Sequence, residues 1–439
     1  MPGYRGRSID ERPMAYDAYD GNGHRRSESR VPSSSRTLYH DDSEGDSVMT
    51  ELSNRKRAPL VTESLSEAVS LGAQAQSKAK PVRIWAVVGG AILAFQLYVW
   101  IRWITGPNFE RVPKGPSDPP MLMKAILTTW TAVILVGLPV GIYYFIVRPW
   151  RRERRITLDG MLLVACGLLF FQDPLLNYFN TWCTYNTWMW NRGSWVQDVP
   201  GWVSFGEPGR TMAEPLLMNA PGYSYGVLLC TILGCWVMRR AKSRWPNISN
   251  AGLIGVLVVW TFFFDFVIEG LFLMPMGLFT YPGAIKSLSI NAGHYYQWPL
   301  YEGLMWGGVQ AGLCALRYFT DDRGRTFVER GLERVQGGFA KQQLMRFLAI
   351  FAACSMSFLV FYTIPSQWFA LHAESWLKDI QKRSYFMLGG ICGDGTDRLC
   401  PDPALPMPGK NSGHINPDGK LVLPEGVTLP EIVPFERGK

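Results

Sequence analysis

The stretch AGLIGVLVVWTFFFDFVIEGLFLMP, residues 251–275, decides the fold class of this chain. It contains no Lys or Arg, and it is longer than the roughly 20 apolar residues that a helix needs to cross a bilayer. Two acidic residues, Asp265 and Glu269, interrupt it. Their spacing of four residues places both on one face of a helix. Acidic residues within a membrane span are costly and usually mark a functional position.

Further apolar stretches lie on both sides of this one, so the sequence predicts about seven transmembrane helices. In chain order we place these helices at residues 84–104, 121–147, 158–179, 222–238, 251–275, 298–318 and 344–364. A soluble protein with buried helices is the alternative, but so many such stretches, with basic residues clustered at alternate ends, disfavour it. The predicted fold class is therefore all-α, a polytopic membrane helix bundle.

The basic residues predict the orientation of this bundle. The 439-residue chain has a net charge of +8 at pH 7, which could suit a nucleic-acid-binding protein. Its basic clusters, however, lie beside alternate helix ends, at residues 78–83, 148–155, 239–244 and 317–341. All of them fall on one side of the membrane, so the positive-inside rule predicts a cytoplasmic N-terminus. We therefore expect these charges to set topology, and we expect no nucleic-acid partner.

The composition changes sharply along the chain. Its mean hydropathy of +0.01 averages a polar segment with an apolar one. Residues 1–82 hold twelve basic and twelve acidic residues and few apolar ones, a composition that predicts a disordered cytoplasmic tail. The transmembrane domain follows at 83–364, and a loop-rich, non-cytoplasmic tail at 365–439. Within that last part Cys392 and Cys400 are close in sequence; they form a disulfide or remain free thiols, depending on the compartment.

An additional helix is predicted between the sixth and seventh spans. Val328, Leu332, Val335 and Phe339 recur with helical spacing. The pattern indicates an amphipathic helix, either lying on the cytoplasmic membrane surface or packed under the bundle.

Four carboxylates within or beside the apolar stretches are the candidate catalytic residues: Asp173, Asp265, Glu269 and Glu302. The predicted topology places all four at one depth, in the outer half of the membrane. Desolvation and like-charge proximity favour keeping one such carboxyl protonated near neutral pH, as a general acid, while an ionised neighbour accepts a proton. This chemistry suits ring closure through an oxocarbenium ion or carbocation. The same acids could instead relay protons or coordinate ions in a transporter.

Aromatic and amide residues are dense in two segments near these acids, and they are the candidate substrate-binding residues. They are Asn177, Tyr178, Trp182, Tyr185, Asn186, Trp188, His294, Tyr295, Trp298 and Tyr301. Trp and Tyr also anchor proteins at membrane interfaces, which is the alternative reading. Asn beside Tyr at this density is better suited to a ligand that carries polar groups.

Motifs for several other chemistries are missing from the sequence. It contains no GxxxxGK[ST], no HExxH, and no aspartate-rich diphosphate motif of the kind that starts a cyclisation by loss of a leaving group. We therefore expect no metal and no cofactor, and we expect protonation to be the trigger.

Several segments together resemble the avermectin-type spirocyclase family of membrane proteins. They are Arg148–Glu153, Ile156–Gly160, Phe171–Tyr178, Asn191–Trp195, Pro200–Trp202 and Glu214–Leu217. The likeness spans roughly residues 83 to 400. It implies a multi-pass membrane cyclase of secondary metabolism that forms a spiroketal or cyclic ether from a hydroxy-ketone polyketide. The long polar tail hints at a eukaryotic relative, in which an epoxidised terpenoid or meroterpenoid chain would be cyclised by the same chemistry.

The sequence therefore predicts a membrane-bound, cofactor-independent cyclase with a lipophilic small-molecule substrate. We expect contact with the lipid bilayer and with other enzymes of the same pathway. The membrane would be of endoplasmic-reticulum type in a eukaryote, or the cytoplasmic membrane in a bacterium. The alternative function is a transporter or proton-coupled carrier of a small lipophilic metabolite. A seven-helix receptor is disfavoured, because the predicted N-terminal orientation is opposite to that of the common receptors.

Overall fold

The computed structural model describes residues 80–115, 117–202, 212–386 and 414–423, together with residues 426 and 428. The predicted disordered tail lies outside the described residues up to position 79, as does the cysteine pair Cys392 and Cys400.

The predicted helical membrane fold is confirmed. The described chain is mostly helical, and six helical stretches are long and apolar enough to cross a membrane. They are Pro81–Thr105, Met121–Glu153, Leu158–Asn177, Leu216–Arg244, Asn250–Leu273 and Phe339–Leu371. Each of them overlaps a predicted span.

The remaining predicted span, 298–318, is helix α9 (Leu300–Tyr318), and it is not among these six. Glu302, Gln310 and Arg317 lower its hydropathy. They are tolerated because α9 packs against three other helices, α7, α8 and α10, so that Glu302 and Gln310 are buried in protein rather than exposed to lipid.

Most spans consist of several helical segments in succession. The α-helices of the spans are α2 (Lys80–Thr105), α3 (Met121–Ile142), α4 (Arg148–Glu153), α5 (Leu158–Leu169), α6 (Leu216–Pro221), α7 (Val227–Arg244), α8 (Asn250–Asp265), α10 (Phe339–Phe358) and α11 (Ile364–Leu371). The π-helical segments are η1 (Tyr143–Val147), η5 (Gly222–Gly226), η6 (Phe266–Leu273) and η10 (Leu359–Thr363). Short 3-10 segments η2 (Phe170–Gln172) and η3 (Pro174–Asn177) end the span that begins with α5, and α12 (Lys378–Gln381), η4 (Val196–Asp198), η7 (Lys286–Leu288) and η11 (Ser384–Phe386) lie outside the spans.

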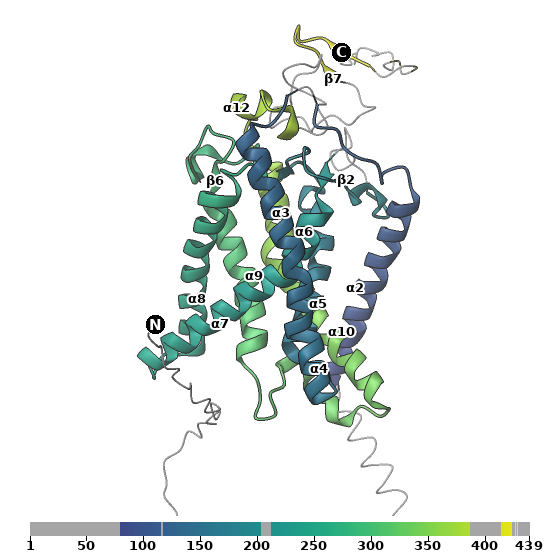
Figure 1. Cartoon of the computed structure of the whole chain (residues 1–439), viewed down its shortest axis with the longest axis vertical. Helices are drawn as coiled ribbons and strands as arrows, with labels where there is room; N and C mark the ends of the chain where they lie inside the picture. The colour runs from purple at the N-terminus through teal and green to yellow at the C-terminus, as the bar shows by residue number, and fades with distance from the viewer. Residues whose placement is uncertain are drawn as a thin grey trace, which may run out of the picture. The chain divides into compact units, whose positions relative to one another are not determined.

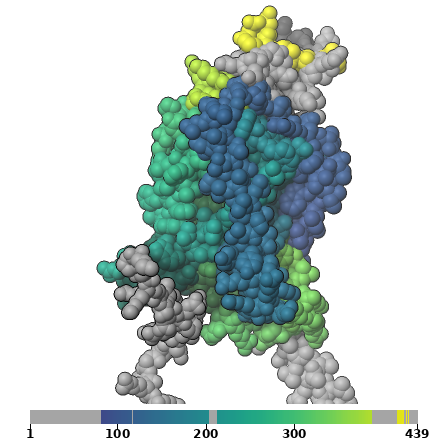
Figure 2. All heavy atoms as spheres, in the orientation of Figure 1, coloured from purple at the N-terminus to yellow at the C-terminus, as the bar shows by residue number. Residues whose placement is uncertain are grey.

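The bundle is held together by close helix contacts. Of all pairs of described elements, α2 and α10 share the most extensive one, and α8 packs against α9 (Figure 1). Figure 2 shows α3, drawn in blue, covering the face of the bundle nearest the viewer. At Gly89 the backbone of α2 approaches α10 so closely that a Cβ would lie 2.0 Å from the Leu348 carbonyl oxygen. Small residues permit such approaches between membrane helices.

The loops at the two ends of the bundle group as the predicted topology requires. At one end, Arg317 pairs with Asp159 at 2.8 Å, Arg346 pairs with Glu329, and the Val82 amide donates to the Arg330 carbonyl. These contacts bring the basic connections together on one side. At the other end, Ser117 bonds to Ser384, and Lys286 pairs with Glu374 at 3.5 Å.

Four two-stranded antiparallel ribbons organise loops outside the spans. They pair β1 (Thr184–Tyr185) with β4 (Phe279–Thr280), β2 (Arg192–Gly193) with β3 (Ala213–Glu214), β5 (Ser289–Ile290) with β6 (Trp298–Pro299), and β7 (His414–Ile415) with β8 (Leu421–Val422). The β1–β4 ribbon carries Tyr185 and the β2–β3 ribbon carries Glu214, and each ribbon fixes the position of that side chain.

The amphipathic helix predicted from Val328, Leu332, Val335 and Phe339 is wrong. The segment forms two 3-10 turns, η8 (Phe327–Glu329) and η9 (Leu332–Arg334), separated by Gly331 at a φ of 91°. A positive φ ends a right-handed helix, so the helical spacing is not realised. Val328 and Val335 are nevertheless buried.

We predict that Gly89→Ala destabilises the folded protein in detergent, because the new methyl group meets backbone that cannot rotate away. Overpacking of this kind typically costs about 1–3 kcal/mol. Gly90→Ala is the matched control, since its Cβ would meet nothing closer than 3.9 Å. Alanine is also the better helix former, so the control should melt no lower than wild type. Equal melting temperatures for the two variants, followed by tryptophan fluorescence, would contradict the close contact of α2 with α10.

Candidate active site

All four predicted acids line one cavity of about 250 Å³. Its polar lining consists of Asp173, Cys183, Tyr185, Asn219, Tyr223, Cys230, Asp265, Glu269, Tyr281, Glu302 and Tyr362. Apolar groups form the rest, among them Trp130, Ile134, Leu176, Phe264, Leu273 and Trp306. The common depth predicted from topology is therefore accompanied by convergence on one space. Whether these acids are catalytic stays a prediction.

Asp173 lies between η2 and η3 and is buried with two phenols bound to it. Tyr223 donates to Oδ1 at 2.6 Å, and Tyr185 donates to Oδ2 at 2.8 Å. Hydrogen bonds from hydroxyl groups to both oxygens stabilise the carboxylate form after it has left water.

Glu214 on β3 is a fifth acid in this region, and the sequence analysis did not select it as a site residue. Its side chain is fully buried against Asp173. Burial, and next the negative charge of Asp173, raise the pKa of Glu214 well above its usual range. A protonated Glu214 can donate a hydrogen bond to Asp173, so the two groups together need only one negative charge.

The other three acids form a cluster elsewhere in the lining of the same cavity. Carboxylate oxygens of Asp265, Glu269 and Glu302 all lie within 4.8 Å of one another. Tyr281 donates to Glu269 at 3.3 Å and Tyr362 donates to Glu302 at 2.9 Å. One oxygen each of Asp265 and Glu302 is buried without a hydrogen-bond partner among the described residues.

Such a cluster permits two chemical uses. Carboxylate oxygens this close can share a proton, which removes the repulsion between them and satisfies the unpaired oxygens. They could also ligate a cation, since hard divalent ions prefer oxygen ligands. The geometry of the acids is compatible with both uses. From the sequence we expect no metal and no cofactor.

In the described part of the chain, no Lys or Arg forms an ion pair with any of these five acids. Neutralisation in the cavity therefore depends on protons and hydroxyl donors. This distinguishes the cavity from the end of the bundle that carries the basic connections, where Asp159 and Glu329 are paired with arginines.

Three π-helical segments supply cavity residues. η5 carries Tyr223, η6 carries Glu269 and η10 carries Tyr362. Each extra residue in the helical turn re-aims the side chains that follow it, and π-helical turns are frequent at functional sites. Sequence periodicity does not reveal these segments, because segments of five to eight residues are too short to show a period of their own.

Of the ten predicted substrate-binding residues, Tyr185 lines the cavity and the other nine do not. Trp182 and Tyr301 form a buried aromatic layer with Phe369, in which Tyr301 stacks on Phe369 at 3.8 Å between ring centroids. Trp182 also contacts Tyr281, a cavity residue. These two side chains therefore support the cavity wall from behind.

The two predicted asparagines shape loops. Asn177 accepts hydrogen bonds from the amides of Trp182 and Cys183, and Asn186 donates to the Gly277 carbonyl at 2.8 Å. Both are buried and satisfied by backbone groups.

The remaining five predicted residues also lie away from the cavity. Trp298 is fully buried against Phe262 and Phe266. Tyr295 donates to the Pro275 carbonyl at 2.7 Å. Tyr178 and Trp188 are half-buried in the loop after η3, and His294 is exposed.

The residues that sequence reasoning missed are Glu214, Tyr223, Tyr281 and Tyr362. The three tyrosines resemble ordinary interfacial anchors in sequence, and only their hydroxyl contacts distinguish them. Glu214 did carry a signal, since it opens the Glu214–Leu217 segment quoted above for its family resemblance.

Comparison with known proteins yields one family. A family model described as Spirocyclase AveC-like matches residues 153–386, a range that includes all five acids. No significant match was found among curated proteins or among solved structures.

We predict that Glu214→Gln makes stability less dependent on pH. Because the pKa of Glu214 is higher in the folded than in the unfolded state, folding binds a proton, and stability falls as pH rises from the unfolded pKa of about 4.3 towards the folded one. One such group accounts for up to about 1.4 kcal/mol per pH unit in that range. Glutamine has no proton to lose, so the variant should show a shallower decline in melting temperature between pH 5 and pH 9.

Glu374→Gln is the matched control for this measurement, because Glu374 forms a partly exposed ion pair with Lys286. It should keep the wild-type pH profile. A wild-type slope in Glu214→Gln would contradict a buried, protonated Glu214.

Proposed function

Because the chain belongs to the AveC-like spirocyclase family, we propose that it is a membrane-embedded enzyme that closes a ring in a lipophilic secondary metabolite. The family supports cyclase activity in secondary metabolism, and the apolar helices support a membrane location. The observation that carries the chemistry is the cavity itself. It brings four carboxyls and four tyrosines together, with a fifth carboxyl behind Asp173.

The proposed proton donor is the cluster of Asp265, Glu269 and Glu302. Three ionised carboxylates this close would repel one another strongly in a medium of low dielectric constant. A proton held within the cluster is therefore available to a ketone or epoxide oxygen of the substrate. General acids of this kind contribute roughly 10²–10⁴-fold to rate.

The proposed proton acceptor is Asp173. Its two tyrosine donors stabilise the ionised form, and Glu214, which is buried beside Asp173, can donate a third hydrogen bond when it is protonated. The cavity thus holds an acid and a base in different environments, which is the arrangement that acid–base catalysis requires.

The steps balance without a further reactant. The cluster protonates the substrate carbonyl or epoxide oxygen while an internal hydroxyl forms the new carbon–oxygen bond and passes its proton to Asp173. For a dihydroxy-ketone the product is a hemiketal, whose hydroxyl group takes up the proton that Asp173 received and leaves as water. The second hydroxyl captures the resulting oxocarbenium ion and returns its proton to the cluster, so that the spiroketal is complete and both acidic groups regain their starting states. Aromatic rings such as Trp306 and Trp130 can stabilise this cation through their faces.

The size and lining of the cavity fit a reacting segment rather than a whole metabolite. A volume of about 250 Å³ lies slightly below the roughly 300–1,000 Å³ of typical ligand sites. Apolar groups of α3 and η6, such as Ile134 and Leu273, surround the polar residues. These features support a polyketide or terpenoid chain, whose apolar remainder extends beyond the carboxyl groups.

We predict that Asp265→Asn and Glu302→Gln each reduce ring closure by at least 10²-fold, because the shared proton loses one of its holders. Purified protein in detergent would be incubated with a linear dihydroxy-ketone and, separately, with an epoxidised prenyl phenol. Mass spectrometry would follow loss of one water or isomerisation. Asp118→Asn is the control, since Asp118 is exposed and pairs with Lys114 and Lys124.

Wild-type turnover in both cavity variants would refute the assignment of the acid. Turnover without any ion gradient separates an enzyme from a carrier, which would move the compound unchanged. Activity that persists in EDTA supports the shared proton, whereas activity abolished by EDTA and restored by one divalent ion assigns the cluster to a cation.

Tyr223→Phe and Tyr225→Phe form a second matched pair, both in η5. Tyr223 donates to Asp173, whereas Tyr225 donates to the Ile134 carbonyl and does not line the cavity. We expect Tyr223→Phe to lower kcat about 10-fold or more with little change in KM, because Asp173 loses a donor. Tyr225→Phe should keep wild-type kcat. A reduction of equal size in both would indicate disruption of η5 and would argue against Asp173 as the base.

A further inference from the structure

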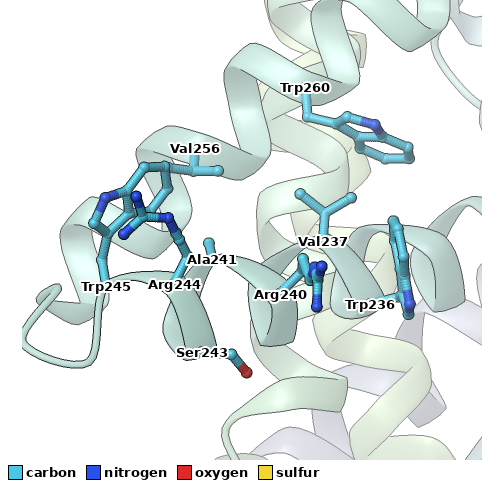
Figure 3. A pocket seen from close by; sticks show the side chains of 9 residues that line it. All are labelled: Trp236, Val237, Arg240, Ala241, Ser243, Arg244, Trp245, Val256 and Trp260. Atoms are coloured by element: carbon cyan, nitrogen blue, oxygen red, sulfur yellow. The ribbon is translucent and has the colours of Figure 1, made fainter.

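A second hollow lies toward the end of the bundle that is predicted to be cytoplasmic, and it shares no lining residue with the active-site cavity. It has a volume of about 520 Å³ and lies between the C-terminal half of α7 and the middle of α8 (Figure 3). Its lining is Trp236, Val237, Arg240, Ala241, Ser243, Arg244, Trp245, Val256 and Trp260. We call it the α7–α8 groove.

The groove combines apolar walls with two guanidinium groups. Trp236, Arg240 and Arg244 follow one another at intervals of four residues and so share one face of α7. Figure 3 shows Trp236 and Arg240 at one end of the groove, Arg244 and Trp245 at the other, and Val256 and Trp260 above them on α8. A ligand that fits must therefore carry both an anion and an apolar part.

Among the described residues, the two arginines have no anionic partner. No acidic side chain of the described residues forms an ion pair with Arg240 or Arg244, and both are exposed. Arg239 and Lys242 on the same two turns add to the positive charge but do not line the groove. The charge of the groove is thus left for a ligand to complement.

The position of the groove corresponds to the boundary between hydrocarbon and headgroups. The candidate span Leu216–Arg244 ends there and Asn250–Leu273 begins there. Trp236 and Trp245 remain 59% and 52% exposed, as expected of tryptophans in the interfacial layer. This end also carries the basic connections that predict the cytoplasmic side, where the leaflet contains anionic lipids.

We propose that the α7–α8 groove binds one anionic phospholipid of the cytoplasmic leaflet. The anionic headgroup extends along the groove between its two arginine ends, and the start of an acyl chain packs against Val237, Val256 and Trp260. Charge complementarity selects an anionic headgroup, and the depth of the apolar walls selects a lipid over a free anion. This inference is independent of the proposed cyclase activity.

The test is native mass spectrometry of the full chain in detergent, titrated with phosphatidylserine, phosphatidylcholine or inorganic phosphate. Wild-type protein should retain phosphatidylserine, and neither phosphatidylcholine nor inorganic phosphate should displace it. A direct charge-assisted hydrogen bond from a guanidinium group to the headgroup contributes roughly a tenfold factor in affinity or more. The double variant Arg240→Gln, Arg244→Gln should therefore bind phosphatidylserine about 100-fold more weakly.

The matched control is Arg239→Gln with Lys242→Gln, which removes the same charge from the same helix turns outside the groove. It should keep wild-type binding. Equal losses in the two double variants would overturn the proposal in favour of a diffuse surface charge. Equal binding of phosphatidylcholine, or displacement by inorganic phosphate, would also overturn it. Both latter comparisons use wild-type protein, so they hold even if a variant fails to fold.

Discussion

The cavity depends on one constraint, the cost of placing carboxyl groups inside a membrane protein without neutralising cations. Among the described residues, no Lys or Arg pairs with Asp173, Glu214, Asp265, Glu269 or Glu302. Hydroxyl donors and neighbouring carboxyls take the place of counter-ions. The helices must therefore position tyrosines and acids at the same depth. This requirement explains departures from regular α-helix that close packing alone does not require.

Those backbone features are local departures from regular α-helix. η5, η6 and η10 re-aim Tyr223, Glu269 and Tyr362, while the short β1–β4 and β2–β3 ribbons bring in Tyr185 and Glu214. The α-helical parts of the same spans supply membrane length and close contacts. The division resembles that of many enzymes, in which a regular scaffold carries irregular segments where the chemistry occurs.

The acidic residues of the cavity and the arginines lie at different levels along the bundle. The described partners of the acids in the cavity are hydroxyl groups and other carboxyl groups, and we propose that ring closure occurs there. The end of the bundle predicted to be cytoplasmic contains arginines, two of which face the α7–α8 groove. This separation keeps cations away from the acids, because a nearby arginine would stabilise their ionised forms and remove the proton that the proposed reaction needs.

The sequence alone determined the membrane class, the approximate spans, the grouping of the basic connections and the positions of four acids within or beside the spans, because length, hydropathy and charge are properties of local segments. It also supported the family through contiguous motifs. Tertiary structure alone decided which side chains share the cavity. Tyr223, Tyr281 and Tyr362 line the cavity. Trp182 packs behind its wall against Tyr281, and Asn177 binds loop backbone instead. The physical reason is that π-helical turns and two-residue ribbons change side-chain direction without changing composition, and only packing between distant segments determines where they occur.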